Sequence, residues 1–360
     1  MLQISNHGID GLRDDLKDRK LYIFGAGKRA RFVYKQYDFQ GKVTAFIDNN
    51  ADREFVTFDA VKIPLWNVET FNKVVATEGI QNSVLLITPV YYSYEIVQQL
   101  DKIKELDGLK TYIEVMMSDV YKEQLIEFTN GENVIPKKIH YCWFGGKEIP
   151  DEFVRYIEGW KKLCPDYEII RWDETNYDYK KNQYMREAYD NKKYGFVPDY
   201  ARLDIIYNEG GIYLDTDVEL IRKPDRLLMN DAFFGFQNEY IINMGLGFGA
   251  RKGQSFVKEL RDYYNGKSFY NDDGTLNLDS CFHYQNPLFV EKGFRLDNTY
   301  QLKDGIACYP SEVLAPLGSS GFCENFTENT IASHHASMSW VGDKKGGIKK
   351  VKEVLLRRNE

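Results

Sequence analysis

The stretch Phe196–Leu220, FVPDYARLDIIYNEGGIYLDTDVEL, predicts a short helix, a break at two glycines and a strand. Asp199 is expected to cap the helix N-terminus, with Pro198 just outside the helix. Gly210 and Gly211 are expected to end the helix, because a left-handed backbone is needed there. The residues that follow, Ile-Tyr-Leu, are good strand formers.

Asp215 and Asp217 form a D-x-D pair at the end of this strand. Residues i and i+2 of a strand point to the same side, so the sequence predicts two carboxylates presented together. Two like charges side by side repel, and a divalent cation supplies the counter-charge. Carboxylate oxygens suit Mg²⁺ or Mn²⁺, which also bind substrate phosphates. The pair therefore predicts a metal site for a nucleotide diphosphate; a polar strand end that faces solvent is the simpler alternative.

The pattern around the pair resembles glycosyltransferase family 32. That family includes bacterial capsular-polysaccharide sugar transferases, fungal initiating mannosyltransferases and, more distantly, the catalytic domains of clostridial glucosylating toxins. The pattern D-x-x-R, then GG-x-Y-x-D-x-D, is much more specific than D-x-D alone. Its residues here are Asp199, Arg202, Gly210, Gly211, Tyr213, Asp215 and Asp217. The resemblance covers about residues 135–341 and implies a GT-A-type nucleotide-sugar-binding domain.

The composition is that of a globular protein with room for two domains, because the chain has 360 residues of which 43% are apolar. Its net charge of −7 argues against general nucleic-acid binding. No apolar run is long enough to span a bilayer, and the first residues lack a signal-peptide pattern. The five cysteines have no C-x-x-C spacing, which favours reduced thiols. We therefore expect a cytoplasmic protein, with an oligomeric state that the sequence does not indicate.

Residues 1–130 alternate strand and helix patterns, which predicts a Rossmann-like parallel sheet. The run Leu21–Phe24 leads into G-x-G-x-x-A, and a second strand, Val43–Ile47, follows. Glycines in such a turn let a phosphate approach the helix N-terminus. The candidate cofactor-binding residues are Gly25, Gly27 and Asp48.

The ligand of this first domain stays open. A structural or regulatory role, a nucleotide or sugar-nucleotide ligand, and NAD(P)-dependent redox chemistry are all compatible with the turn. No convincing proton-relay motif lies downstream to support a dehydrogenase.

A second domain, residues 131–345, is predicted to begin with the strand pattern PKKIHYCWFGG. This pattern resembles the first strand of the family's catalytic domain. In the toxin-like members the matching tryptophan stacks on the uracil of UDP-glucose, so the resemblance implicates Trp143 in base recognition. An aromatic at the carboxyl end of a strand is well placed for that role. A core tryptophan is the alternative.

The resemblance also implies roles around the D-x-D pair. Residues that match Asp199 and Arg202 hold the donor sugar hydroxyls and the diphosphate, with a helix cap and a local ion pair as the alternatives. The residue that matches Asp215 contacts ribose or sugar and reaches the metal through water, whereas Asp217 is the direct metal ligand. Tyr213 is expected beside the donor.

Asn243 opens the glycine-rich segment NMGLGFGA, which resembles the family's N-x-x-x-x-A segment beside the anomeric carbon. A glycine-rich strand lets a sugar approach the backbone closely. Asn243 is therefore expected to contact the donor sugar.

The segment ASHHASMSW near the end resembles a family segment whose His or Glu completes the metal shell. His335 has the matching spacing to Trp340, so it is expected to be a metal ligand in preference to His334. Ser339 and Trp340 are expected near the diphosphate. Met338 stands where relatives often have Gly or Ser, which leaves the geometry of this loop open.

The tail, residues 346–360, has an apolar face and a face rich in Lys and Arg. This pattern predicts a basic amphipathic helix. Such a helix either lies on anionic lipid at the inner face of the cell membrane or packs on the protein with its charged face in solvent.

Together these features predict a metal-dependent, retaining glycosyltransferase with a Rossmann-like domain in front. It is expected to move a hexose from a nucleotide diphosphate sugar, UDP-hexose in preference to GDP-hexose, to a saccharide or lipid-linked saccharide acceptor in bacterial surface polysaccharide or glycan synthesis. The alternatives are a catalytically silent nucleotide-sugar-binding or regulatory protein, an NAD(P)-dependent oxidoreductase and a host-directed protein glucosyltransferase. The absence of a secretion segment counts against the last of these.

Overall fold

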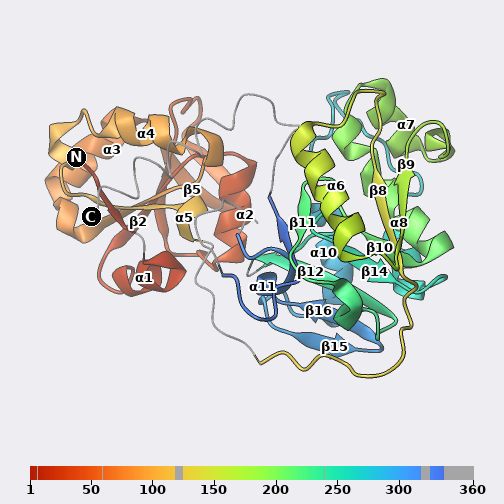
Figure 1. The fold of residues 1–360 in the computed structure, drawn as a ribbon. Helices are drawn as coiled ribbons and strands as arrows, with labels where there is room; N and C mark the ends of the chain where they lie inside the picture. The colour runs from red at the N-terminus through yellow and green to blue at the C-terminus, as the bar shows by residue number, and fades with distance from the viewer. Residues whose placement is uncertain (6, 59, 118–124, 239, 318–324, 336–360) are drawn as a thin grey trace. The chain divides into compact units, whose positions relative to one another are not determined.

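A computed structural model describes residues 1–5, 7–58, 60–117, 125–238, 240–317 and 325–335 of the chain. The chain folds into two compact units, one within residues 1–120 and one within residues 121–340 (Figure 1). The predicted domain boundary at residues 130 and 131 stays a prediction, because the division between the units falls in residues 118–124, outside the described residues.

Unit 1 alternates strands and helices along the chain. Its strands are β1 (Gln3–Ser5), β2 (Lys20–Phe24), β3 (Val43–Ile47), β4 (Phe55–Phe58), β5 (Val61–Trp66), β6 (Ser83–Ile87) and β7 (Lys110–Ile113). Its α-helices are α1 (Gly8–Asp15), α2 (Lys28–Gln36), α3 (Val68–Glu78), α4 (Ser93–Leu100) and α5 (Glu114–Met117).

The strand order in unit 1 is β1-β7-β6-β2-β3-β5-β4, and every neighbouring pair except β4 with β5 is parallel. From β2 the chain adds β3 and β5 on one side, then crosses to β6 and β7 on the other. This is the doubly wound order of a Rossmann-type sheet, whose ligands bind outside the carboxyl ends of the strands where the order reverses. The β-α-β unit predicted around Val43–Ile47 is confirmed.

Unit 2 is built from a mixed sheet and helices. Its strands are β8 (Lys138–Cys142), β9 (Glu168–Trp172), β10 (Gly211–Tyr213), β11 (Val218–Leu220), β12 (Ala232–Asn238), β13 (Ile241–Ile242), β14 (Phe248–Ala250), β15 (Gln301–Lys303), β16 (Ile306–Tyr309) and β17 (Ala332–His334). Its α-helices are α6 (Asp151–Leu163), α7 (Gln183–Asp190), α8 (Pro198–Glu209), α9 (Ser255–Asp262), α10 (Phe282–Glu291) and α11 (Ser311–Leu314).

The main sheet of unit 2 has the order β15-β16-β12-β14-β10-β8-β9, and β11 pairs separately with β17. Strands β9, β8 and β10 are parallel, so their carboxyl ends lie at one edge of the sheet. Strand β14 is antiparallel to both β10 and β12, so β12 also runs parallel to β10. The residues that follow β9, β8, β10 and β12 therefore share this edge with those that precede β14.

Two apolar cores cover the two faces of this sheet. One core contains residues of α7, α8, α9 and α10, with Tyr213 and Phe234 from the sheet. The other contains Ile157 and Trp160 of α6 and Val313 of α11, with Ile212 from the sheet. Unit 2 is thus a layered α/β structure, as predicted, and its central strands are buried on both sides. In the described part of the chain no helix combines the length and the apolar character needed to span a bilayer.

Candidate active site

The turn that carries the D-x-D pair is held by the helix and strand before it. Gly210 and Gly211, with φ of 68° and 110°, end α8 as predicted. A methyl group at Gly210 would lie 2.8 Å from the backbone nitrogen of Lys252, so the chain passes too close to its neighbours for a side chain. Strand β10, which lies between β8 and β14, then runs to the edge of the sheet where the parallel strands have their carboxyl ends.

Asp215 and Asp217 lie in a turn between β10 and β11, not on a strand. The backbone N–H of Val218 donates to the carbonyl of Asp215 at 3.1 Å, which closes the turn. The prediction that strand alternation presents the two carboxylates together is therefore wrong. The tight turn brings them together instead, because its ends are close in space.

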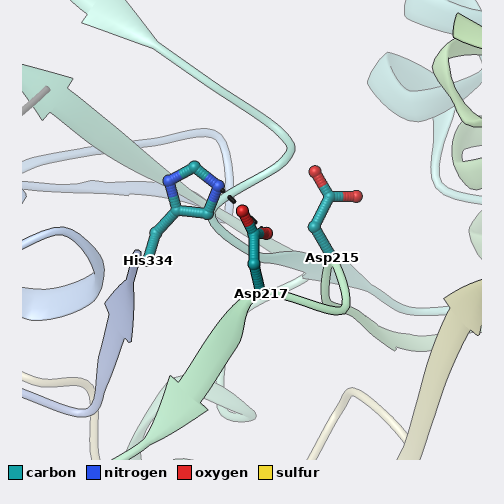
Figure 2. Close-up of side chains that lie close together, drawn as sticks. All are labelled: Asp215, Asp217 and His334. Carbon is teal, nitrogen blue, oxygen red and sulfur yellow. Dashed lines mark ion pairs between the residues drawn. The ribbon is translucent and has the colours of Figure 1, made fainter. Parts of the chain in front are cut away.

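Three side chains meet at this turn: Asp215, Asp217 and His334 each offer a ligand atom, and these atoms lie within 4.8 Å of one another. Figure 2 shows the carboxylate of Asp217 between the imidazole of His334 and the carboxylate of Asp215. Nε2 of His334 lies 3.4 Å from Oδ1 of Asp217. The imidazole comes from the end of β17, whose residue His334 is paired with Val218 of β11.

His335, the histidine predicted to be the ligand, lies elsewhere. Its Nε2 is 3.0 Å from Oε2 of Glu219, and its ring stacks on Tyr156 of α6 with 4.7 Å between ring centres. Successive residues of a strand point to opposite faces, so only one of two adjacent histidines can face the carboxylates. The register of β17 on β11 gives that place to His334. His335 instead ties β17 to β11, because its backbone N–H also donates to the carbonyl of Asp217.

A buried ion pair lies behind the turn. Nη2 of Arg202 is 3.2 Å from Oδ1 of Asp199, and its Nη1 is 3.6 Å from Oδ1 of Asp215. Asp199 and Arg202 are only 4% and 3% exposed. Asp199 does not cap α8, since Val197 is the N-cap residue and Pro198 begins the helix. Arg202 therefore supports Asp215 from the core, and the donor contacts that the resemblance implies for Asp199 and Arg202 stay predictions.

Tyr213, expected beside the donor, is also buried, at 1% exposure. Its hydroxyl donates to Oδ1 of Asp215 at 2.8 Å, and the guanidinium carbon of Arg202 lies 5.0 Å from the centre of its ring. Tyr213 therefore orients Asp215 from inside the core and does not line a surface for the donor.

The charges of this cluster do not balance. Burial raises the pKa of Asp215, and Asp217 adds to the rise while Arg202 opposes it. Burial also raises the pKa of Asp199 to about 7, against the effect of Arg202. Burial by itself lowers the pKa of His334, but Asp217 and Asp215 outweigh it and the net pKa is raised. Every shift disfavours further negative charge, which is the environment that a bound divalent cation relieves.

Trp143 follows β8 at the same edge of the sheet and is half-buried. Its Nε1 donates to the carbonyl of Lys147 at 2.6 Å, and its ring packs edge-on against Phe153 of α6. The ring is thus only partly covered, and its role in base recognition stays a prediction.

The next strand contributes Trp172, whose Nε1 donates to Nδ1 of His140 at 3.0 Å. Nε2 of His140 in turn donates to the carbonyl of Gly210 at 2.9 Å. Burial lowers the pKa of His140 to about 4, so the ring is neutral and fixes the end of α8.

Asn243 lies before β14, next to the carboxylates. Its Oδ1 accepts from the backbone N–H of Gly245 at 2.8 Å, and its Nδ2 donates to Oε1 of Gln237 at 2.8 Å. A methyl group at Gly245 would lie 2.6 Å from Oδ2 of Asp215 and 3.2 Å from Oδ1 of Asn243. Gly245 and Gln237 were not singled out from the sequence; the glycine-rich run around Gly245 was the only available signal.

Ser339, Trp340 and the tail at residues 346–360 lie outside the described residues, so their predicted roles stay predictions.

The turn predicted in unit 1 is present after β2. Gly25 has a φ of 96°, and a methyl group there would lie 2.8 Å from Cγ of Pro89. Gly27 caps α2, with open space around it. Oδ2 of Asp48 accepts from the backbone N–H of Ala26 at 3.0 Å, so the acid at the end of β3 closes onto the glycine turn. The three predicted residues are thus brought together at one edge.

Part of this site, including Asp215 and Asp217, lies in a region that is similar to known sugar transferases. Residues 150–234 match the family model described as a glycosyltransferase sugar-binding region containing a DXD motif. The chain is 34% identical over 149 residues to inositol phosphoceramide mannosyltransferase 3 of Schizosaccharomyces pombe, over 40% of this chain and 40% of that protein. It is 27% identical over 161 residues to mannosyl phosphorylinositol ceramide synthase SUR1 of Saccharomyces cerevisiae, over 42% of this chain and 38% of that protein.

Among solved structures, the chain is similar to the PaToxG glycosyltransferase, with 17% identity over 44% of this chain and 70% of that chain. The TM-score of 0.34 is too low to establish a shared fold. The chain spans about two fifths of the length of the two curated relatives.

The matched region contains α8, β10 and the turn with Asp215 and Asp217. The chain therefore carries the DXD-containing region of glycosyltransferases, and the predicted resemblance is confirmed. The layered mixed sheet of unit 2 fits the predicted GT-A-type α/β class.

Proposed function

We propose that the protein is a metal-dependent glycosyltransferase that moves a hexose from a nucleotide diphosphate sugar to a saccharide or lipid-linked saccharide acceptor. The observation that carries the proposal is that Asp215 and Asp217, inside the matched region 150–234, meet His334 with their ligand atoms within 4.8 Å of one another. Carboxylate and imidazole ligands at the carboxyl edge of a parallel sheet suit an ion that also binds a diphosphate.

The cluster fits Mn²⁺ or Mg²⁺, because it places three ligand groups together and leaves excess negative charge in a buried place. Asp217 and His334 would hold the ion, with Asp215 directly or through water. When bound, the ion neutralises the charge that develops on the departing diphosphate. The chain's own residues keep the site in shape: Tyr213 and Arg202 fix the carboxylate of Asp215, and His335 fixes the end of β17.

The finer features of the proposed reaction rest on Trp143, on the names of the curated relatives and on the family resemblance. Trp143 favours a uracil base, and hence a UDP-hexose, whereas the names of the two curated relatives add mannose to the candidate sugars. Those names also favour a lipid-linked acceptor and contact with a membrane surface over a bacterial surface polysaccharide. Retention at the anomeric carbon follows from the resemblance, and we favour same-face attack with the leaving phosphate as base.

The test is release of free nucleoside diphosphate from a panel of UDP- and GDP-sugars, with Mn²⁺ and with EDTA. Slow release from one donor that EDTA stops, and that Asp217→Ala abolishes, supports the proposal. The matched control is Asp272→Ala, which removes an exposed carboxylate from a loop of the same unit and should release at the wild-type rate. If no donor releases nucleoside diphosphate and no donor binds, the proposal is contradicted.

A second candidate function, NAD(P)-dependent chemistry or regulation by a nucleotide in unit 1, is favoured by its doubly wound strand order and by the contact of Asp48 with the glycine turn. Binding of NAD(P) that Gly25→Val abolishes and that needs no divalent ion would support it. A protein that binds donor and metal without turnover is the remaining alternative, and the panel assay separates it by binding without release.

A further inference from the structure

A glutamine that the family resemblance does not mark lies at the same sheet edge as the carboxylates. Gln237 is near the carboxyl end of β12, and β12 runs parallel to β10 because both are antiparallel to β14. Parallel strands end at the same edge, so Gln237 reaches the edge that carries Asp215. Its side chain is half-buried, and so it can be reached by a ligand.

The amide of Gln237 is oriented by a chain of hydrogen bonds. The backbone N–H of Gly245 can only donate, so the atom of Asn243 that faces it, at 2.8 Å, must be Oδ1. Nδ2 of Asn243 is then the donor to Gln237 at 2.8 Å, and the atom that accepts must be Oε1. Nε2 of Gln237 is thereby directed away from Asn243. Within the described part of the chain, this Nε2 donates no hydrogen bond to the protein.

The cluster of ligand groups divides the sheet edge into two sides. On one side lie β8 and β9, with the half-exposed ring of Trp143, whose flat surface suits a base. On the other side lie β14 and β12, with two amides, which suit hydroxyl groups. A diphosphate bound at the carboxylates with its nucleoside toward Trp143 has its sugar toward Gln237.

The backbone at Gly245 lies where the ligand cluster meets the amide pair. A methyl group there would lie 2.6 Å from the carboxylate of Asp215, 3.2 Å from the amide of Asn243 and 3.3 Å from Nη1 of Arg202, so only a glycine fits at this place. The amide pair therefore lies beside the ligand cluster, within the reach of a sugar whose diphosphate is bound there.

We infer that Gln237 is a specificity residue for the transferred sugar: its Nε2 donates a hydrogen bond to a sugar hydroxyl, and Asn243 is the positioning residue that orients it. The inference deepens the proposed function and rests on it. The inference also changes the role expected for Asn243 from contact with the donor sugar to orientation of Gln237, because both Oδ1 and Nδ2 of Asn243 already have a partner in the protein. An amide that is placed to pair with a sugar hydroxyl discriminates against a sugar that places the hydroxyl elsewhere.

The experiment is isothermal titration calorimetry with UDP, GDP, UDP-glucose, UDP-galactose and GDP-mannose, each in the presence of Mn²⁺. Gln237→Leu is compared with the wild-type chain and with Gln183→Leu, which removes an exposed glutamine on α7 that bonds Glu187. We expect Gln237→Leu to weaken the preferred sugar nucleotide about tenfold and to reduce the preference over the other sugars by the same factor. Affinity for the bare nucleoside diphosphate should stay within about twofold, and Gln183→Leu should change neither.

Two further variants separate recognition from structure. Gln237→Glu keeps the oxygen that Asn243 bonds but removes the donor, so it should lose sugar affinity even if Gln237→Leu fails to fold. Asn243→Asp keeps the bond to Gly245 but replaces the Nδ2 donor by an oxygen, so the amide of Gln237 turns over and its Nε2 bonds that oxygen in place of the sugar. The variant should raise the KM for the sugar nucleotide more than it lowers kcat.

Unchanged sugar-nucleotide affinity in both Gln237→Leu and Gln237→Glu, with tight binding by the wild-type chain, would overturn the inference and leave the proposed function standing. A wild-type chain that binds none of the five probes would overturn both.

Discussion

The carboxylates at the two sheet edges of this protein are compensated in different ways. In unit 1, Asp48 accepts from the backbone N–H groups of Ala26 and Asn50, and buried Glu114 is paired with Arg29. In unit 2, three carboxylates share one guanidinium and one imidazole.

These three carboxylates are Asp199, Asp215 and Asp217, and their partners are Arg202 and His334. A parallel sheet with a glycine turn therefore does not by itself make a cation site. The edge of unit 2 differs from that of unit 1 in bringing the ligand atoms of two carboxylates and an imidazole within 4.8 Å of one another, and the comparisons below test that difference.

The largest effect is expected from the buried guanidinium. Arg202→Met leaves the buried Asp199 and the half-buried Asp215 without their shared counter-charge, which should cost about 4 kcal/mol of the free energy of unfolding of unit 2. Hydrogen exchange of peptides from α8 measures this loss. Arg29→Met is the matched change in unit 1 and should cost less, because it removes the counter-charge of one carboxylate, Glu114, and the Arg29 side chain is itself 34% exposed. Equal losses at the two sites would show that the two edges do not differ in this way.

The next effect concerns activity. Asp215→Asn keeps the shape of the side chain and an acceptor for Tyr213, but removes one negative charge from the cluster. Release of nucleoside diphosphate with Mn²⁺ should fall about 10²-fold, the scale on which a single electrostatic group contributes to catalysis. Asp48→Asn in unit 1 should leave the rate of release within about twofold. A similar fall for both variants would place unit 1 in the reaction.

A smaller effect is expected from pH. The pKa of His140 is lowered by burial from 6.5 to about 4, so below pH 6.5 the unfolded chain binds a proton that the folded chain does not. Stability should therefore rise with pH in this window, and the contribution of His140 should fall by about 2 kcal/mol from pH 7 to pH 5. Burial raises the pKa of Asp199 to about 7, which acts in the opposite sense.

Urea unfolding at the two pH values, of the wild-type chain and of His140→Gln, isolates the part that belongs to His140. The variant should show the weaker loss on acidification. An equal loss in both chains would mean that the ring does not stay neutral in the folded state.

The smallest effect compares two glycines. Gly245→Ala would place a methyl group 2.6 Å from Oδ2 of Asp215, so the carboxylate must shift and Mn²⁺ should bind about tenfold more weakly. Gly27→Ala in unit 1 meets no atom within 4 Å, and its φ of −86° suits alanine. It should therefore change neither metal binding nor release. Unaltered Mn²⁺ affinity in Gly245→Ala would show that the Asp215 turn adapts freely.

Local patterns in the sequence were sufficient for most of the fold. The strand Val43–Ile47 was predicted with the bounds that the structure has, because it is a short run of strand-forming residues between clear breaks. Gly210 and Gly211 were placed correctly as a break of the same kind. The turn at Asp215 and Asp217 was mistaken for a strand, since a tight turn after three strand residues has no distinct pattern.

The site needed information that only long-range pairing supplies. Which of His334 and His335 faces the carboxylates depends on the register of β17 against β11, and a one-residue slip would exchange them. The burial of Tyr213, which turns an expected donor contact into a support for Asp215, follows from the packing of α8 on the sheet. The orientation of Gln237 depends on Asn243 and on a backbone N–H, and no spacing rule in the sequence connects them.

The most direct test of the central claim is a Mn²⁺ titration followed by electron paramagnetic resonance, with the wild-type chain, His334→Ala and His335→Ala. The account predicts that the wild-type chain binds one ion tightly at this edge. It also predicts that His334→Ala weakens binding about tenfold or more, and that His335→Ala changes it by no more than about threefold. No binding by the wild-type chain, or loss of binding in His335→Ala with none in His334→Ala, would contradict the site described above.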